Sequence, residues 1–343
     1  MLRSAWIRAK RIRKGGCMKV LITGGAGFIG GHLTENLLKD GHEVWSIDDF
    51  STGSRENIRN SEKNPRFHFT EGNMIHSPEL EEMVKNADQI VHLAAVVGVE
   101  LVVRDPIGTI MTNVNGSERI LSLASRYGKR IILASTSEVY GKSVKEHFSE
   151  QDDLVIGPST HSRWSYACSK LLDEFLLMAY VRNKQLKGTV VRFFNTVGPR
   201  QTGQFGMVVP RFTEAARKGL PLRVYGTGGQ TRCFCHVFDT VRALRLLMER
   251  DDIYGRIFNI GSTHGITIEE LAKLTIRLLD SGSKIERIPY DKAYESGFED
   301  MLHRAPNCDA IGALTGWKAE IPLEQIILDV AQSQKNAEKN GQE

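Results

Sequence analysis

The segment that most constrains the fold of this chain is a glycine-rich turn between an apolar strand and a helix. Residues 20–23 read VLIT, and residues 24–30 read GGAGFIG before a helical pattern that continues to Leu38. Glycines at positions 24, 27 and 30 permit a tight turn, a close approach of the backbone to a pyrophosphate, and close packing of helix against strand. The segment therefore predicts the first strand and helix of a dinucleotide-binding α/β fold.

Two acidic residues, Asp48 and Asp49, follow the second apolar segment, residues 43–47. Asp48 stands 24 residues after Gly24, at the end of the expected second strand. A carboxylate at this place accepts hydrogen bonds from the ribose hydroxyls of adenosine and repels a 2′-phosphate. We therefore expect NAD, rather than NADP, as the cofactor.

Apolar strand patterns then alternate with helical patterns along the chain. Strands are expected at 67–69, 89–95, 131–136 and 188–195, with helices between them. This alternation predicts an α/β fold with a doubly wound parallel Rossmann sheet. Residues 196–235 are richer in Gly and Pro, which indicates a smaller C-terminal substrate-binding lobe. We expect the NAD-binding domain over 18–195 and 236–262, and the lobe over 196–235 and 263–335.

The strand at 131–136 ends in hydroxyl residues, and a later helix begins with Tyr166 and Lys170. Four residues make one helical turn, so both side chains lie on one face. A lysine ammonium beside a phenol favours the phenolate, which predicts that Tyr166 accepts a proton near neutral pH. Thr136, at the strand end, is expected to hold the same substrate oxygen. A chance Tyr-x-x-x-Lys spacing on an exposed helix is the alternative, which the nearby glycine turn disfavours.

Composition and charge argue against several kinds of partner. Residues 1–17 hold six basic and no acidic residues, and without them the net charge falls from +4 to −2, so no nucleic-acid partner is expected. This basic leader, expected to be disordered, has no apolar run long enough for a signal peptide or membrane span. Five cysteines without framework spacing favour a reducing, cytoplasmic compartment. Cys233 and Cys235 are interpreted as part of one packed strand, so no metal site is expected.

The combination of these motifs resembles the extended short-chain dehydrogenases/reductases, the NAD-dependent epimerase/dehydratase family. The resemblance extends from Met18 to about Val330. It rests on the glycine turn, Asp48, His92-Leu93-Ala94-Ala95, Thr136, Tyr166, Lys170, Arg192-Phe193-Phe194-Asn195, Gly198-Pro199-Arg200 and Arg232. It implies an enzyme that keeps NAD, acts on a UDP-sugar and forms a homodimer through helices over 106–127 and from Tyr166 onward.

The resemblance also implies which residues form the site. The expected cofactor-binding residues are Gly24, Gly27, Phe28, Ile29, Gly30, Asp48, Asp49, Asn73, Leu93, Ala94, Ala95, Tyr166 and Lys170. The expected substrate-binding residues are Asn195, Val209, Arg211, Tyr225, Arg232 and Arg304. The expected catalytic residues are Thr136, Ser137, Glu138, Tyr166, Lys170 and Arg304.

Within the family, Ser137 and Glu138 after Thr136 resemble the UDP-glucuronate decarboxylases, as does segment 294–304. The arginine matching Arg304 is the proposed proton donor in those enzymes. Three alternatives stay open. The chain is instead a UDP-sugar 4-epimerase acting on UDP-glucose or UDP-glucuronate; it is a non-catalytic NAD-binding scaffold, although scaffolds usually lack the Tyr or Lys; or Glu138 and Arg304 form only a structural ion pair.

Overall fold

The computed structural model describes residues 16–98, 105–204, 207–289, 301 and 304–340. Nearly all of the expected basic leader, and most of segment 294–304, lie outside these residues. Within them, a central sheet has the strand order β12-β7-β5-β4-β1-β2-β3, and every neighbouring pair is parallel. The strands are β1 (Lys19–Thr23), β2 (Glu43–Asp48), β3 (Phe67–Glu71), β4 (Gln89–His92), β5 (Arg130–Thr136), β7 (Lys187–Phe193) and β12 (Ile257–Ile260). The chain starts in the middle and winds outward both ways, which confirms the predicted doubly wound Rossmann sheet.

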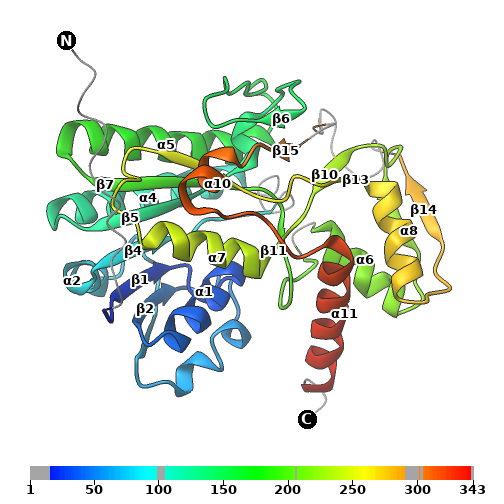
Figure 1. Cartoon of the computed structure of the whole chain (residues 1–343), viewed down its shortest axis with the longest axis horizontal. Helices are drawn as coiled ribbons and strands as arrows, with labels where there is room; N and C mark the ends of the chain where they lie inside the picture. The colour runs from blue at the N-terminus through cyan, green and yellow to red at the C-terminus, as the bar shows by residue number, and fades with distance from the viewer. Residues whose placement is uncertain (1–15, 99–104, 205–206, 290–300, 302–303, 341–343) are drawn as a thin grey trace.

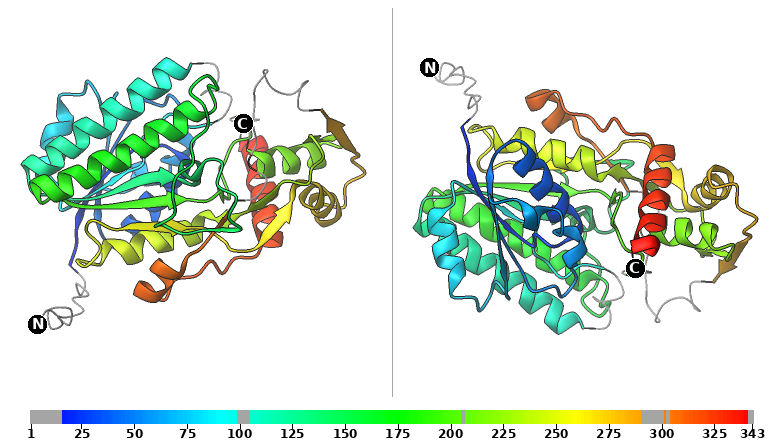
Figure 2. Two further views of the ribbon diagram at one scale, coloured as in Figure 1. Left: turned by 90° about the horizontal axis from the view of Figure 1, so that it is seen from above. Right: turned by 90° about the horizontal axis from the view of Figure 1, so that it is seen from below.

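Helices cover both faces of this sheet (Figures 1 and 2). On one face lie α2 (Glu79–Asn86), α4 (Pro106–Arg126) and α5 (Trp164–Lys184). On the other lie α1 (Phe28–Lys39), α7 (Val237–Met248) and α10 (Asp309–Thr315). Because side chains alternate along a strand, Val20 and Ile22 enter the core under α1 and α7, whereas Leu21 enters the core under α2 and α4. Burial on both sides explains why each strand is a continuous apolar run.

A smaller lobe with its own hydrophobic core lies beside the sheet (Figure 1). It contains α6 (Val208–Arg217), β9 (Leu222–Tyr225), β10 (Thr231–Cys233), β13 (Gly265–Thr267), α8 (Ile268–Leu278), β14 (Ile285–Ile288) and α11 (Leu323–Asn340). Short connecting elements are η1 (Arg55–Asn57), η2 (Ser61–Lys63), η3 (Ser137–Tyr140), β6 (His147–Phe148), β8 (Thr196–Val197), β11 (Cys235–His236) and β15 (Ala305–Pro306). Phe212, Leu271 and Ile326 bring α6, α8 and α11 together in the lobe core. The exact domain bounds stay a prediction.

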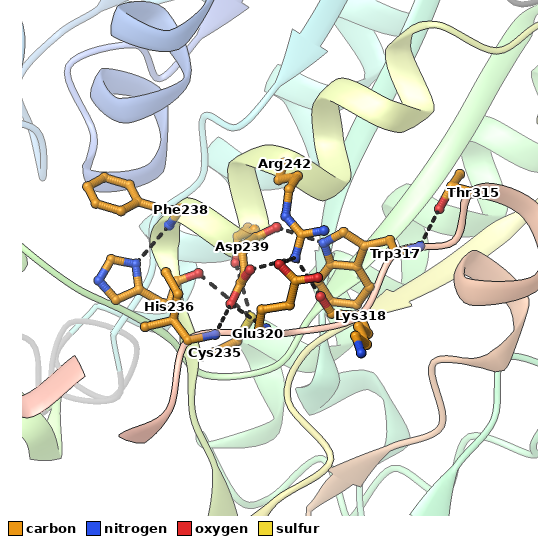
Figure 3. A network of polar contacts seen from close by, with 11 residues as sticks. Cys235, His236, Phe238, Asp239, Arg242, Thr315, Trp317, Lys318 and Glu320 are labelled. Atoms are coloured by element: carbon orange, nitrogen blue, oxygen red, sulfur yellow. Dashed lines mark hydrogen bonds and ion pairs between the residues drawn. The ribbon is translucent and has the colours of Figure 1, made fainter. Parts of the chain in front are cut away.

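A buried carboxylate, Asp239, fixes the chain that leads to α11 against α7 (Figure 3). Its Oδ2 accepts hydrogen bonds from the backbone N–H groups of Glu320 and Ile321, both at 2.9 Å. Its Oδ1 pairs with Arg242 at 2.7 Å, and the indole of Trp317 donates to its backbone carbonyl at 2.9 Å. These contacts satisfy the buried charge and attach the segment before α11 to the side of the sheet.

The cysteines are all unpaired, and two of them differ from the sequence interpretation. Cys233 ends β10 and Cys235 begins β11, so they lie in two short strands rather than one. The reason is that the chain changes partners at Phe234, because β10 pairs with β13 and β11 pairs with β8. Among the helices that the structure describes, none has the length and apolarity needed to cross a membrane.

Candidate active site

A single continuous cavity of about 530 Å³ lies where the carboxyl ends of the sheet strands meet the lobe. This is the edge at which open α/β sheets bind their ligands. All of the site residues predicted from the sequence line the cavity, although Gly24 and Arg304 are 280 positions apart. The lining includes Gly24, Gly27, Phe28, Ile29, Gly30, Asp48, Asp49, Asn73, Leu93, Ala94, Ala95, Thr136, Ser137, Glu138, Tyr166, Lys170, Asn195, Val209, Arg211, Tyr225, Arg232 and Arg304.

The glycine turn leaves no room for side chains. Gly24 has a φ of +74°, and a Cβ there would lie 2.7 Å from the Ala94 nitrogen. A Cβ on Gly30 would lie 2.3 Å from the Gly24 carbonyl oxygen. Helix α1 begins after Gly27 without a side-chain cap, so its first N–H groups are available to a ligand. This arrangement fits a dinucleotide pyrophosphate.

Asp48 lies at the end of β2, beside the turn, and supports its shape. Its two carboxylate oxygens accept hydrogen bonds from the N–H groups of Ala26 and Phe50, both at 2.9 Å. Burial raises the pKa of Asp48 despite these bonds. Each oxygen keeps a second lone pair, so the carboxylate is able to accept a ribose hydroxyl as well. Asn73 donates to the neighbouring Asp49 at 2.9 Å, which places an amide beside the same wall of the cavity.

Tyr166 and Lys170 lie one turn apart at the start of α5, as the spacing predicts. The pKa of Tyr166 is nevertheless raised, chiefly by burial and then by the negative charge of Glu138. A hydrogen bond with Thr136, at the end of β5, acts in the opposite direction. The net shift of the phenol pKa is therefore opposite to the direction expected from Lys170 alone, and the role of Tyr166 as proton acceptor stays a prediction.

Lys170 also has a negatively charged partner beside the phenol. Its ammonium donates to Asp173 Oδ2 at 2.7 Å, and both side chains are almost fully buried. An ammonium paired with a carboxylate has little net charge to offer a neighbour. Asp173 itself contributes to the raised pKa of Tyr166. Asp173 therefore opposes ionisation of Tyr166, while the Lys170 ammonium keeps two further N–H donors for other partners.

Glu138, in η3, forms the charged centre of the cavity. Arg304 pairs with its Oε1, and Arg163 Nη2 lies 3.2 Å from its Oε2. Burial alone would raise the pKa of Glu138, but the charges of Arg304 and Arg163 lower it to about 2. Arg304 also donates to Asn195 Oδ1 at 2.9 Å. Asn195 has a φ of +35°, a conformation that Asn tolerates better than most residues.

Two residues that pair with predicted site residues, Arg163 and Asp173, were given no role in the sequence prediction. Arg163 stands three positions before Tyr166, and Asp173 stands three positions after Lys170. Positions three apart on a helix are neighbours, so the i, i+3 spacing of Lys170 and Asp173 was a usable signal. No sequence signal connects Arg163 with Glu138, because that contact joins two separate elements.

The fold and the cavity define an α/β protein in which a glycine turn that fits a dinucleotide and a helix with a Tyr-x-x-x-Lys motif line the same cavity. The profile of the NAD dependent epimerase/dehydratase family matches residues 20–261. The chain belongs to this family, and NAD is its cofactor. This confirms the family, the enzyme class and the cofactor predicted from the sequence.

Known proteins similar to this chain include decarboxylases and epimerases. A UDP-N-acetyl-alpha-D-glucosaminuronate decarboxylase from Bacillus cytotoxicus is 39% identical over 315 residues, covering 92% of this chain and 97% of that protein. UDP-glucuronic acid decarboxylase 1 from Xenopus tropicalis is 36% identical over 307 residues, covering 90% of this chain and 70% of that protein. The crystal structure of UDP-glucuronic acid 4-epimerase from Bacillus cereus, in complex with UDP-glucuronic acid and NAD, has a TM-score of 0.85 and 25% identity, covering 93% of this chain and all of that one.

We expect the purified protein to retain NAD, which acid denaturation followed by mass spectrometry of the supernatant detects. Gly30→Ala is expected to purify without nucleotide, because the added Cβ meets the Gly24 carbonyl. Gly282→Ala, where a Cβ meets nothing within 4 Å, is the matched control and is expected to retain it. Recovery of NADP, or of no nucleotide from a wild-type protein that also fails to bind added NAD, would contradict the assignment of Asp48 and the glycine turn.

Proposed function

We propose that this chain is a UDP-glucuronate decarboxylase. The observation that carries the proposal is the charged group formed by Glu138 and Arg304 beside Tyr166 and Thr136. A phenol and a hydroxyl suffice to oxidise a sugar carbon with NAD. An additional carboxylate and arginine at the same place suit a substrate that carries its own charged group there. The names of the relatives from Bacillus cytotoxicus and Xenopus tropicalis both support decarboxylation, and that of the Xenopus tropicalis protein supports UDP-glucuronate as the substrate.

The residues divide the reaction into two steps. Bound NAD supplies the acceptor for the hydride from C4 of the sugar. Tyr166, once ionised, takes the proton of the C4 hydroxyl while Thr136 holds that oxygen. The C4 ketone then lies β to the C6 carboxylate, so the C5–C6 bond breaks, carbon dioxide leaves, and the electron pair moves onto the C4 oxygen as an enolate.

The second step needs stabilisation of that enolate and a proton at C5. The Tyr166 phenol and the Lys170 ammonium donate to the C4 oxygen, and removal of one such donor typically costs roughly 3 kcal/mol of transition-state stabilisation. Arg304 delivers or relays the proton to C5, and Glu138 with Ser137 positions the sugar. Hydride return at C4 completes a UDP-pentose, or the 4-keto sugar leaves first.

A 4-epimerase is the second candidate, favoured by the likeness to the Bacillus cereus enzyme. It uses the same Tyr166 step but rotates the ketone and reduces its other face. In that reaction Glu138 has no chemical task, although it is held between two arginines. For this reason we place it second.

Incubation with three substrates separates these functions. UDP-glucuronate, UDP-N-acetylglucosaminuronate and UDP-glucose are supplied in turn, and carbon dioxide and product masses are followed. We expect carbon dioxide and a product lighter by that mass from UDP-glucuronate. Release from the N-acetylated substrate alone would move the specificity to that sugar. A mass-neutral conversion without carbon dioxide would show that the epimerase proposal is the correct one.

We propose that two copies of the chain associate through α4 and α5, which lie side by side on one face of the sheet (Figure 2). Ile107 and Met111 on α4 are 76% and 53% exposed, and Leu172 and Phe175 on α5 are 49% and 61% exposed. Spacings of three and four place each pair on one side of its helix. Together they form an apolar surface suited to a symmetric contact.

Light scattering is expected to give twice the 38.4 kDa mass of one chain. Phe175→Glu is expected to reduce this to one chain mass, because the charge is desolvated in the contact. Leu220→Glu is the control, because Leu220 lies in the lobe and is 54% exposed, close to the value for Phe175. It is expected to leave the mass unchanged. A wild-type protein that stays monomeric at micromolar concentration would contradict the homodimer.

We propose a cytoplasmic location as well. All five cysteines are unpaired, and disulfides are rare among cytosolic proteins. Acid trapping of thiols in cells that produce the protein, followed by mass spectrometry, is expected to show five free thiols.

A further inference from the structure

Glu138 is held by two arginines that belong to different parts of the chain. Arg304 uses one Nη group for Glu138 and the other for Asn195. Arg163 immediately precedes α5 and contacts the other oxygen of Glu138 at 3.2 Å. Because Arg304 faces the cavity, a bound anionic sugar competes with Glu138 for its guanidinium.

Arg163 lines the same cavity, and contacts with the protein itself also hold its side chain. Its side chain is only 6% exposed, and its guanidinium carbon lies 5.3 Å from the centre of the Trp164 ring. That ring is itself buried and packed against Gly157, where a Cβ would come within 2.1 Å of the indole nitrogen. A guanidinium over an aromatic face in a closely packed site has few alternative positions.

We propose that Arg163 is a positioning residue, which holds Glu138 ionised and in place while Arg304 engages the substrate. Arg163 stands three residues before Tyr166 at the start of α5. Its ion pair therefore fixes the position of Glu138 relative to the Tyr166 phenol. This arrangement holds Glu138, beside the departing carboxylate, at a fixed position relative to Tyr166, which removes the C4 hydroxyl proton. The role in carbon dioxide release rests on the proposed function, whereas the effect on Glu138 itself does not.

Among the described residues, the charged and titratable groups that act on Glu138 include Arg304, Arg163, Arg232 and Tyr166. Arg163→Met removes one cation from this set, and Arg163→Lys keeps the charge but loses the planar guanidinium. We expect Arg163→Met to raise the pKa of Glu138, so that its charge is lost at a higher pH as the solution is acidified. The infrared carboxylate band that disappears in Glu138→Gln measures this pKa directly, without substrate.

With UDP-glucuronate, Arg163→Met is expected to lower the rate of carbon dioxide release by roughly 10²-fold, the usual effect of a misplaced catalytic group. The rate of nicotinamide reduction in a single turnover is expected to stay close to that of wild type. The acid limb of carbon dioxide release moves to higher pH, and Arg163→Lys lies between the two. Arg250→Met, which breaks an ion pair with Asp252 outside the cavity, is the control for charge removal.

Two results overturn the inference. One is a Glu138 pKa that is unchanged in Arg163→Met. The other is an equal loss of nicotinamide reduction and carbon dioxide release with an unmoved acid limb, which a purely structural role produces. If wild-type protein releases no carbon dioxide, the proposed function fails, but the infrared pKa of Glu138 still decides whether Arg163 holds it.

Discussion

Tyr166→Phe is expected to reduce turnover of any UDP-sugar substrate by roughly 10³-fold or more, within the range that general acid–base groups contribute. Of the two hydroxyl groups at this place, the Tyr166 phenol is the one able to ionise and act as a base for the C4 hydroxyl. The aliphatic hydroxyl of Thr136 does not ionise near neutral pH. Because hydride cannot leave C4 until the hydroxyl proton is taken, both nicotinamide reduction and carbon dioxide release are lost together. Single-turnover absorbance of the reduced nicotinamide and trapped carbon dioxide measure the two steps.

Loss of activity has to be separated from loss of cofactor or fold. Tyr166→Phe is expected to retain NAD, because the glycine turn and Asp48 are untouched. Tyr127→Phe removes a phenol that bonds to Glu81 outside the cavity, and it is expected to keep wild-type turnover. Wild-type turnover in Tyr166→Phe would show that another group takes the proton.

The raised pKa of Tyr166 gives this step a pH dependence with a definite sign. A base acts only after it has lost its proton, so the rate rises with pH wherever the phenol is still protonated. In the structure described, burial, Glu138 and Asp173 all favour the neutral phenol. The rate of C4 oxidation is therefore expected to increase from pH 6 to pH 9.

The dinucleotide half of the cavity was predictable because its determinants are local. Gly24 and Gly30 are required by backbone contacts within a short segment, and Asp48 follows from the end of the next strand. A spacing of four places Tyr166 and Lys170 on one helix face without any tertiary information. Helical spacing also places Asp173 beside Lys170. The sequence does not show whether the ammonium interacts more strongly with Asp173 or with Tyr166. This preference depends on burial, which tertiary packing sets.

The charged half of the cavity was harder to predict. Glu138 and Arg304 are 166 positions apart, and only resemblance to a family connected them. Arg163 was missed because its contact depends on where a turn before α5 meets η3. Both contacts are long-range and join side chains whose rotamers the neighbouring elements fix. Sequence patterns report periodicity within an element, so they carry little information on such pairs.

Glu138→Gln is expected to separate the two halves of the reaction. The amide keeps the shape of the side chain but removes a charge that is present at any assay pH, because the pKa of Glu138 is about 2. Carbon dioxide release is expected to fall by roughly 10²- to 10³-fold, the range typical for a positioned acid or base. Nicotinamide reduction persists, because Tyr166 and Thr136 remain and the loss of the Glu138 charge favours the phenolate. Reduced nicotinamide and a 4-keto uronate are therefore expected to accumulate, and stopped-flow absorbance with mass spectrometry detects both.

The sign of the pH effect in wild-type protein follows from the same pKa. A carboxylate whose pKa is lowered in the folded state stabilises the fold fully above its ordinary pKa of 4.5. This contribution to the free energy of unfolding is lost as the pH falls toward 2. In the folded protein the ionisation of Glu138 follows its pKa of about 2, so its titration is not expected to change carbon dioxide release at neutral pH. Glu81→Gln, at a carboxylate paired with Arg126 outside the cavity, controls for the amide substitution. Mass-neutral conversion that continues at the wild-type rate in Glu138→Gln would mean that the chain is an epimerase and that the Glu138–Arg304 pair is structural.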